Sequence, residues 1–143
     1  MKVTDIYIKQ CEMAEEVQNN WQPVEGDRFI YRNDLKQKII IYRKESDEPA
    51  INVLCKIMFY LPTLEQLFEM VFKVDIKHRV QMHYGINEAD EEGYQIQVDQ
   101  IDPQDHNYEE EYFTKSIQEG LLQHIYMAEY HKIWTGKKWQ VKS

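Results

Sequence analysis

Hydrophobic residues near the N-terminus recur at steps of three and four positions, which is the spacing of an amphipathic helix. The helix is predicted to begin at Thr4 or Asp5 as its N-cap and to end at the asparagines 19–20. Its buried face would carry Val3, Tyr7, Cys11, Ala14, Val17 and Trp21. The segment WQPVEGD that follows contains Pro23 and Gly26, two residue types that favour a connection over regular structure.

The next apolar segments are short and rich in β-branched and aromatic residues, which favours strands. RFIYRN (28–33) and QKIIIYRK (37–44) flank a DLK triplet, so a β-hairpin is the simplest interpretation. INVLCKIMFY (51–60) is apolar on both faces. This pattern predicts a central strand that is covered on both sides or is at least well buried.

Two later segments alternate between apolar and polar residues, namely VDIKHRVQMHY (74–84) and GYQIQVDQI (93–101). A two-residue period predicts half-buried strands, and the acidic turn Asn87–Glu92 would join them. A helix that extends from Thr63 through residue 83 is the rival interpretation. The period of two favours strands.

Two more helices are predicted in the second half of the chain. Thr63 and Gln66 have the spacing of a capping box and mark the start of the first. The second spans residues 110–131, and Gly120 inside it indicates close packing or simple tolerance. Its core face would carry Phe113, Ile117, Leu121, Ile125 and Ala128. A turn at Gly136 and a short strand would follow.

The order of these elements is helix, three strands, helix, two strands, helix and tail. Strands that follow one another through tight turns pair antiparallel, and helices grouped on one face of a sheet define the α+β class. We therefore predict one domain over residues 1–143, with a mostly antiparallel sheet of about five strands and about three helices.

Three patches resemble a known group of proteins. WQPVEGDRF follows the first helix, YLPTLEQLFEM follows the buried strand, and HKIWTGKKW follows the last helix. Their order is similar to that in small uncharacterised proteins encoded by phages and prophages of Gram-positive bacteria. Those proteins carry W-x-P-x-x-G-D, L-P-x-x-x-Q-L-x-x-M and W-x-G-x-x-W elements. The resemblance implies a phage or prophage origin and a shared fold, and it carries no activity with it.

Composition and charge narrow the function classes. The net charge is −8, which disfavours direct nucleic-acid binding and binding to an anionic membrane surface. No segment has the apolar length of a signal peptide or of a membrane span. Cys11 and Cys55 lie far apart and fit reduced, buried thiols. We expect a cytoplasmic protein without a cofactor.

Negative charge is concentrated in residues 87–111, where ten of the side chains are Asp or Glu and none is Lys or Arg. Since the net charge of the whole chain is −8, the rest of the chain is slightly basic. An anionic surface of this kind can steer a basic host or phage protein. The residues predicted to bind such a partner are Glu88, Asp90, Glu91, Glu92, Asp99, Asp102 and Asp105.

The same segment offers oxygen ligands for a metal ion. Asp99, Asp102, Asp105 and His106 would serve a metal-dependent hydrolase, which is one alternative function. The segment lacks the spacing of an EF-hand loop, so a solvated turn before an acidic helix start is the simpler interpretation. Glu109–Glu111 at that helix start would be favoured by the helix dipole.

Other catalytic arrangements find little support, and we expect no enzyme activity. The serines lack a G-x-S-x-G context, and the five glycines form no phosphate-binding loop. His124 and His131 share a helix face, with one expected inside and one exposed. Trp21, Trp134 and Trp139 are expected to close the rim of the core. A structural or assembly role as a homo-oligomer, built by the apolar and Trp-rich ends, is the other alternative.

Overall fold

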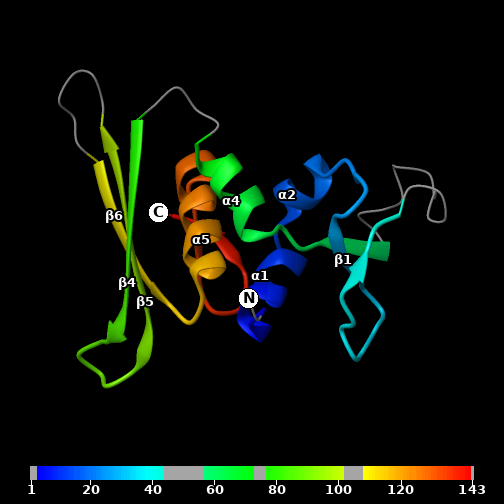
Figure 1. Ribbon diagram of the computed structural model, residues 1–143, viewed down its shortest axis with the longest axis horizontal. Helices are drawn as coiled ribbons and strands as arrows, with labels where there is room; N and C mark the ends of the chain where they lie inside the picture. Colours follow the sequence, from blue (N-terminus) through cyan, green and yellow to red (C-terminus); the bar gives the residue numbers. More distant parts are fainter. Residues whose placement is uncertain (1–2, 44–56, 73–76, 102–107, 143) are drawn as a thin grey trace.

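Helices occupy the middle of the molecule, and a three-stranded sheet stands at each end (Figure 1). The computed structural model describes residues 3–43, 57–72, 77–101 and 108–142. Its elements are α1 (Asp5–Glu12), α2 (Glu15–Asn20), β1 (Arg28–Tyr31), β2 (Ile40–Ile41), β3 (Met58–Tyr60), α4 (Leu64–Val71), β4 (Lys77–Ile86), β5 (Glu92–Ile101), β6 (Tyr108–Thr114), α5 (Ile117–Tyr130), β7 (Lys132–Trp134) and β8 (Trp139–Val141).

The α+β class and the antiparallel pairing are confirmed. The strands of the described part of the chain form three small sheets, however, where the sequence predicted one sheet of about five strands. Their orders are β2-β1-β3, β4-β5-β6 and β7-β8, and every pairing is antiparallel. We call the sheet β4-β5-β6 the meander.

The N-terminal apolar face is buried as predicted, except that Val3 is half-buried. Thr4 caps the first helix, with its hydroxyl accepting from the Tyr7 amide at 3.1 Å. The prediction of one continuous helix was wrong, because the chain breaks between α1 and α2. The break lets Gln18, which is 2% exposed, donate to the carbonyls of Cys11 and Tyr60 at 2.9 Å each. In a continuous helix the Cys11 carbonyl would be used within the helix.

The first sheet contains the predicted hairpin, since β1 pairs with β2. β1 is also the central strand, and β3 lies at the edge beside it. The central position predicted for the 51–60 segment was therefore wrong for its described part. β3 is nevertheless fully buried, because the helices cover it. Residues 51–56 of that prediction lie outside the described residues.

The predicted capping box starts α4, with Thr63 Oγ1 accepting from the Gln66 amide at 3.2 Å and Gln66 Oε1 accepting from the Thr63 amide at 2.8 Å. The strand interpretation of residues 77–84 is confirmed, because they belong to β4 and pair with β5. The predicted turn Asn87–Glu92 follows β4 and connects it to β5 as a hairpin.

The prediction of a helix over residues 110–131 was wrong at its start. Residues up to Thr114 form β6, so Glu109–Glu111 lie in a strand and no helix dipole acts on them. α5 begins after Ser116, whose hydroxyl accepts from the Glu119 amide at 3.3 Å. Glu119 Oε2 accepts in turn from the hydroxyls of Ser116 and Thr4, at 2.8 and 2.6 Å.

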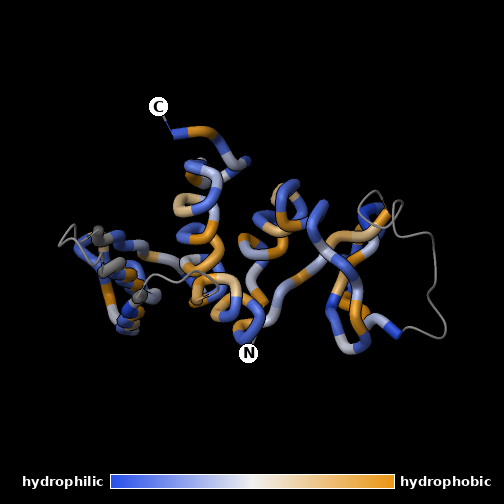
Figure 2. The backbone as a smooth tube through the Cα atoms, turned by 90° about the horizontal axis from the view of Figure 1, so that it is seen from above, coloured by the Kyte–Doolittle hydropathy of each residue, from blue (hydrophilic) through white to orange (hydrophobic). Residues whose placement is uncertain are grey.

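α5 is the central helix and is buried on two sides. Leu121 and Ile125 belong to the main core, as predicted, whereas Phe113 and Ala128 are exposed. The other side of α5 meets the meander at Gly120, where an added Cβ would collide with Ile96. The close packing considered for this glycine is confirmed. Figure 2 shows hydrophobic residues recurring along the helices in the middle and along strands on both sides of them.

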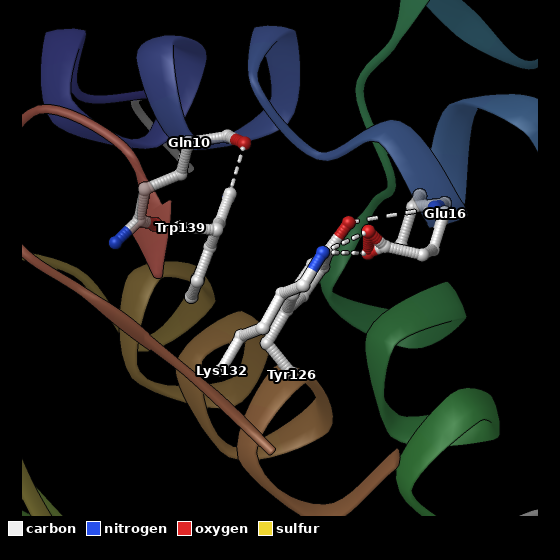
Figure 3. Close-up of polar contacts among 6 residues, drawn as sticks. Gln10, Glu16, Tyr126, Lys132 and Trp139 are labelled. Atoms are coloured by element: carbon white, nitrogen blue, oxygen red, sulfur yellow. Dashed lines mark hydrogen bonds and ion pairs between the residues drawn. The ribbon is translucent and has the colours of Figure 1, made fainter. Parts of the chain in front are cut away.

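The C-terminal hairpin β7-β8 closes the rim of the core, as predicted for Trp139 (Figure 3). The Trp139 ring stacks on Tyr126 with 4.1 Å between centroids, and its Nε1 donates to the Gln10 carbonyl at 3.0 Å. Lys132 Nζ pairs with Glu16 at 2.7 Å and fixes the start of the hairpin to α2.

Candidate functional site

The meander has two different faces because its strands alternate. Ile96 and Val98 on β5 point to one face and are fully buried, and Ile96 packs against α5. The opposite face, which we call the outer face, carries His83, Gln95 and Glu111 on neighbouring strands, all exposed. Most of the predicted binding residues that the structure describes lie at one end of this sheet.

Four predicted acidic residues gather at the β4–β5 turn. The Asn87 side chain organises the turn, since its Oδ1 accepts from the amides of Ala89 and Glu91 at 2.9 and 3.0 Å. Asp90 adopts a left-handed backbone conformation with φ 60°. This compact turn directs polar side chains into solvent, and those of Glu88, Asp90, Glu91 and Glu92 are all exposed. We call these four residues the acidic turn.

Most of the charge of the acidic turn is not paired with any described residue. Glu88, Asp90 and Glu91 form no ion pair with any other described residue. Glu92 accepts a hydrogen bond from the Tyr84 hydroxyl at 3.2 Å, and its negative charge raises the pKa of that phenol. Lys115 donates to the backbone carbonyl of Glu92 at 2.9 Å and forms no ion pair with a carboxylate of the turn.

The other predicted binding residues are placed differently. Asp99 lies toward the far end of the same strand pair, where Arg79 donates to its carboxylate at 2.8 and 3.1 Å. That charged hydrogen bond holds the pKa of Asp99 below its ordinary value. The carboxylate is therefore paired within the sheet and lies apart from the acidic turn. Asp102 and Asp105 lie outside the described residues.

A groove of about 510 Å³ runs over the outer face beside the acidic turn. Phe113 forms part of its wall, and its ring lies over Gly93, where an added Cβ would be 2.9 Å from the ring and 2.6 Å from the Thr114 carbonyl oxygen. Phe113 is 38% exposed, although the sequence predicted it in the core. The lining residues used below are His83, Gly85, Glu88, Gln95, Glu111 and Phe113.

The groove suits the side chain of a lysine or an arginine. An aliphatic stem can lie on the Phe113 ring, and the cationic head then reaches the carboxylates of Glu88 or Glu111. Gln95 orients Glu111 through a long hydrogen bond of 3.5 Å. The sequence indicated that the acidic turn is a candidate binding site. It did not indicate that Phe113 and Glu111 lie beside that turn, because they were predicted in a helix and the structure places them on β6.

The metal and catalytic predictions find no support in the described part of the chain. No group of three or more His, Cys, Asp or Glu residues is arranged there to hold a metal ion. His106 lies outside the described residues, so the hydrolase stays a prediction. Burial raises the pKa of the Cys11 thiol to about 12, which makes it an inert packing residue.

The histidine prediction is confirmed, because His124 is buried and His131 is exposed. His124 Nδ1 lies 3.5 Å from the Glu110 carboxylate, and its ring packs edge-on against Tyr112. Tyr112 also donates to Glu110. This polar cluster joins α5 to β6 and is structural.

Comparisons with protein-family models, with curated proteins and with solved structures give no significant match. The molecule can thus be assigned to the α+β class on its own architecture. No helix within the described residues combines the length and apolar character needed to cross a bilayer.

Proposed function

We propose that this is a binding protein that captures a basic segment of a partner protein at the acidic turn and the adjoining groove. The observation that carries the proposal is that Glu88, Asp90 and Glu91 are exposed, form no ion pair with another described residue and lie beside the exposed ring of Phe113. Unpaired surface carboxylates and an aromatic wall are together what a lysine-rich or arginine-rich segment recognises.

Electrostatics and shape contribute separately to this proposal. The chain's net charge of −8 attracts a basic partner from a distance, and this attraction weakens as salt increases. The groove then selects side chains that combine an apolar stem with a positive head. A partner that carries only dispersed positive charge would use the first effect and gain little from the second.

The test is a binding titration with a short peptide of alternating Lys and Ala residues. The triple variant E88Q/D90N/E91Q is expected to bind about tenfold more weakly, because each exposed charge pair contributes up to about 1 kcal/mol. The control E15Q/E25Q/E65Q removes the same charge at exposed positions of other elements and should bind like the native chain. A Glu-Ala peptide should not bind.

Two results would contradict the proposal. One is an equal loss of affinity in the two triple variants, which would reduce the effect to net charge. The other is an absence of binding between the native chain and the Lys-Ala peptide at low ionic strength.

A second candidate function, self-association, is favoured by β4. α5 packs against β5 and β6. Met82, Tyr84 and Ile86 on β4 are 39%, 64% and 65% exposed. β4 is also an edge strand of ten residues, and such an edge can pair with another chain. Light scattering of the native chain tests this function, and a monomer at every concentration would remove it.

Origin and compartment also belong to the proposal. A phage or prophage source stays a prediction that rests on the three sequence patches. A cytoplasmic location is supported by Cys11, which is buried and free of any disulfide.

A further inference from the structure

A second concavity, of about 530 Å³, lies where the last turns of three helices meet. Asn20 belongs to α2, Glu69 and Met70 to α4, and Glu129 and Tyr130 to α5. We call this concavity the helical cleft. It is separate from the meander groove, and the two share no lining residue.

Two of the sequence patches build the deep wall of the helical cleft. The Trp21 ring stacks on Tyr60, with 5.1 Å between the centroids and 2° between the planes. Asp27 accepts from Trp21 Nε1 at 2.9 Å, from the Val24 amide at 3.0 Å and from Gln66 Nε2 at 2.8 Å. W-x-P-x-x-G-D and L-P-x-x-x-Q-L-x-x-M thus meet at Asp27, and the wall they form is fixed before any ligand arrives.

The cleft has a negative potential from two independent sources. Its lining includes the carboxylates of Asp27, Glu69 and Glu129, and none of the described residues that line it is Lys, Arg or His. The C-terminal ends of α2, α4 and α5, which carry partial negative charge, also border it. None of the three helices has a basic residue in its last turn. The free carbonyls at a helix C-terminus can be satisfied by basic side chains, by water or by a ligand.

The phenols of the cleft respond to this potential. Burial is the main cause that raises the pKa of Tyr60, and the charges of Asp27 and Glu69 add to it. Burial and then Glu129 raise the pKa of Tyr130. Both phenols stay neutral at physiological pH, so they present uncharged rings to a ligand.

We infer that the helical cleft binds an organic ammonium or guanidinium group carried on an apolar stem. Tyr130, Met70 and Ile125 offer apolar surface for the stem, while Glu69 and Glu129 at the mouth attract the positive head. An anion would be repelled by the carboxylates and by the helix C-termini, and a neutral molecule would gain no charge attraction from them. This inference does not depend on the proposed function.

The test follows the indole N–H signal of Trp21 by NMR while three ligands with the same stem are added. Hexylammonium is expected to shift the signal in a saturable way, and hexanol and hexanoate should not. The variant E69Q/E129Q should bind hexylammonium about tenfold more weakly, since both carboxylates are exposed and each contributes modestly. The control E15Q/E65Q changes exposed carboxylates of α2 and α4 outside the cleft and should bind normally.

Two further probes separate the sources of such a group. Nα-acetyl-lysine methylamide represents a side chain of a peptide, and cadaverine represents a free diamine; the tighter of the two identifies the source. Equal shifts with hexanol, or an affinity unchanged in a folded E69Q/E129Q variant, would overturn the inference. The variant E88Q/D90N/E91Q should keep full hexylammonium affinity. The helical cleft is therefore tested independently of the proposed binding of a basic segment at the acidic turn.

Discussion

The acidic turn and the helical cleft are both negatively charged, but the fold holds their charges in opposite ways. Glu88 and Asp90 stand on an exposed hairpin turn, and no described residue pairs with them. Asp27 is 4% exposed and is saturated by three donors. The exposed charges are screened by salt, and their removal changes the folding stability little. The charge of Asp27 is part of the architecture, and removing it leaves buried donors without acceptors.

The largest expected effect is therefore in the cleft wall. Asp27→Ala should reduce the free energy of unfolding by about 3 kcal/mol, because Trp21 Nε1 and the Gln66 amide lose a charged acceptor. Urea denaturation measures this change. Glu25→Ala alters an exposed carboxylate of the same loop and should change stability by less than about 0.5 kcal/mol. Similar losses in both variants would show that the wall does not depend on Asp27.

A smaller effect is expected at the meander groove. Gly93→Ala would place a methyl group 2.6 Å from the Thr114 carbonyl oxygen and 2.9 Å from the Phe113 ring, at a cost of about 1–3 kcal/mol. It should also weaken binding of the Lys-Ala peptide, because Phe113 must move.

Gly85 is the matched control for that substitution, since it pairs with Gly93 in the β4–β5 ladder. No atom lies within 4 Å of an added Cβ at Gly85. Gly85→Ala should therefore leave thermal stability close to native. If the two variants were equally stable, the contact between Phe113 and Gly93 would not constrain the sheet.

The smallest effect concerns the Arg79–Asp99 pair. Because the folded state lowers the pKa of Asp99, the pair stabilises the protein above the unfolded-state pKa, and this contribution is lost as pH falls through the lower folded-state pKa. NMR titration of Asp99 in Arg79→Gln should show its pKa rising toward the ordinary value. At neutral pH the variant should be nearly as stable as the native chain. If the pKa of Asp99 did not change in this variant, Arg79 would not be the cause of its lowered value.

Local signals explain which parts of the fold could be predicted. The capping box at Thr63 and the alternation through Ile96 each lie within a few residues, so they were recognised. The β6–α5 boundary was missed because Phe113 on the strand is spaced four residues from Ile117 on the helix, which imitates one continuous helix face. The Ser116–Glu119 cap was the local signal that marks the true start.

The two candidate sites also differ in how far the sequence could predict them. The acidic turn is continuous in sequence and was predicted, whereas its neighbour Phe113 comes from another strand. The helical cleft joins Trp21, Gln66 and Glu129, which are far apart in the chain. The hydrophobic pattern of a single segment cannot predict that these residues lie close together, because their proximity depends on how the helices pack.

The bond from Thr4 to Glu119 spans 115 positions and has a consequence for synthesis. The N-terminal helices emerge from the ribosome long before α5, which supplies Leu121, Leu122 and Tyr126 to their core. Until then the part of their apolar surface that α5 covers is exposed, so a nascent chain that stops short of residue 117 is a substrate for chaperones and proteases. The core can be completed only after α5 has been synthesised.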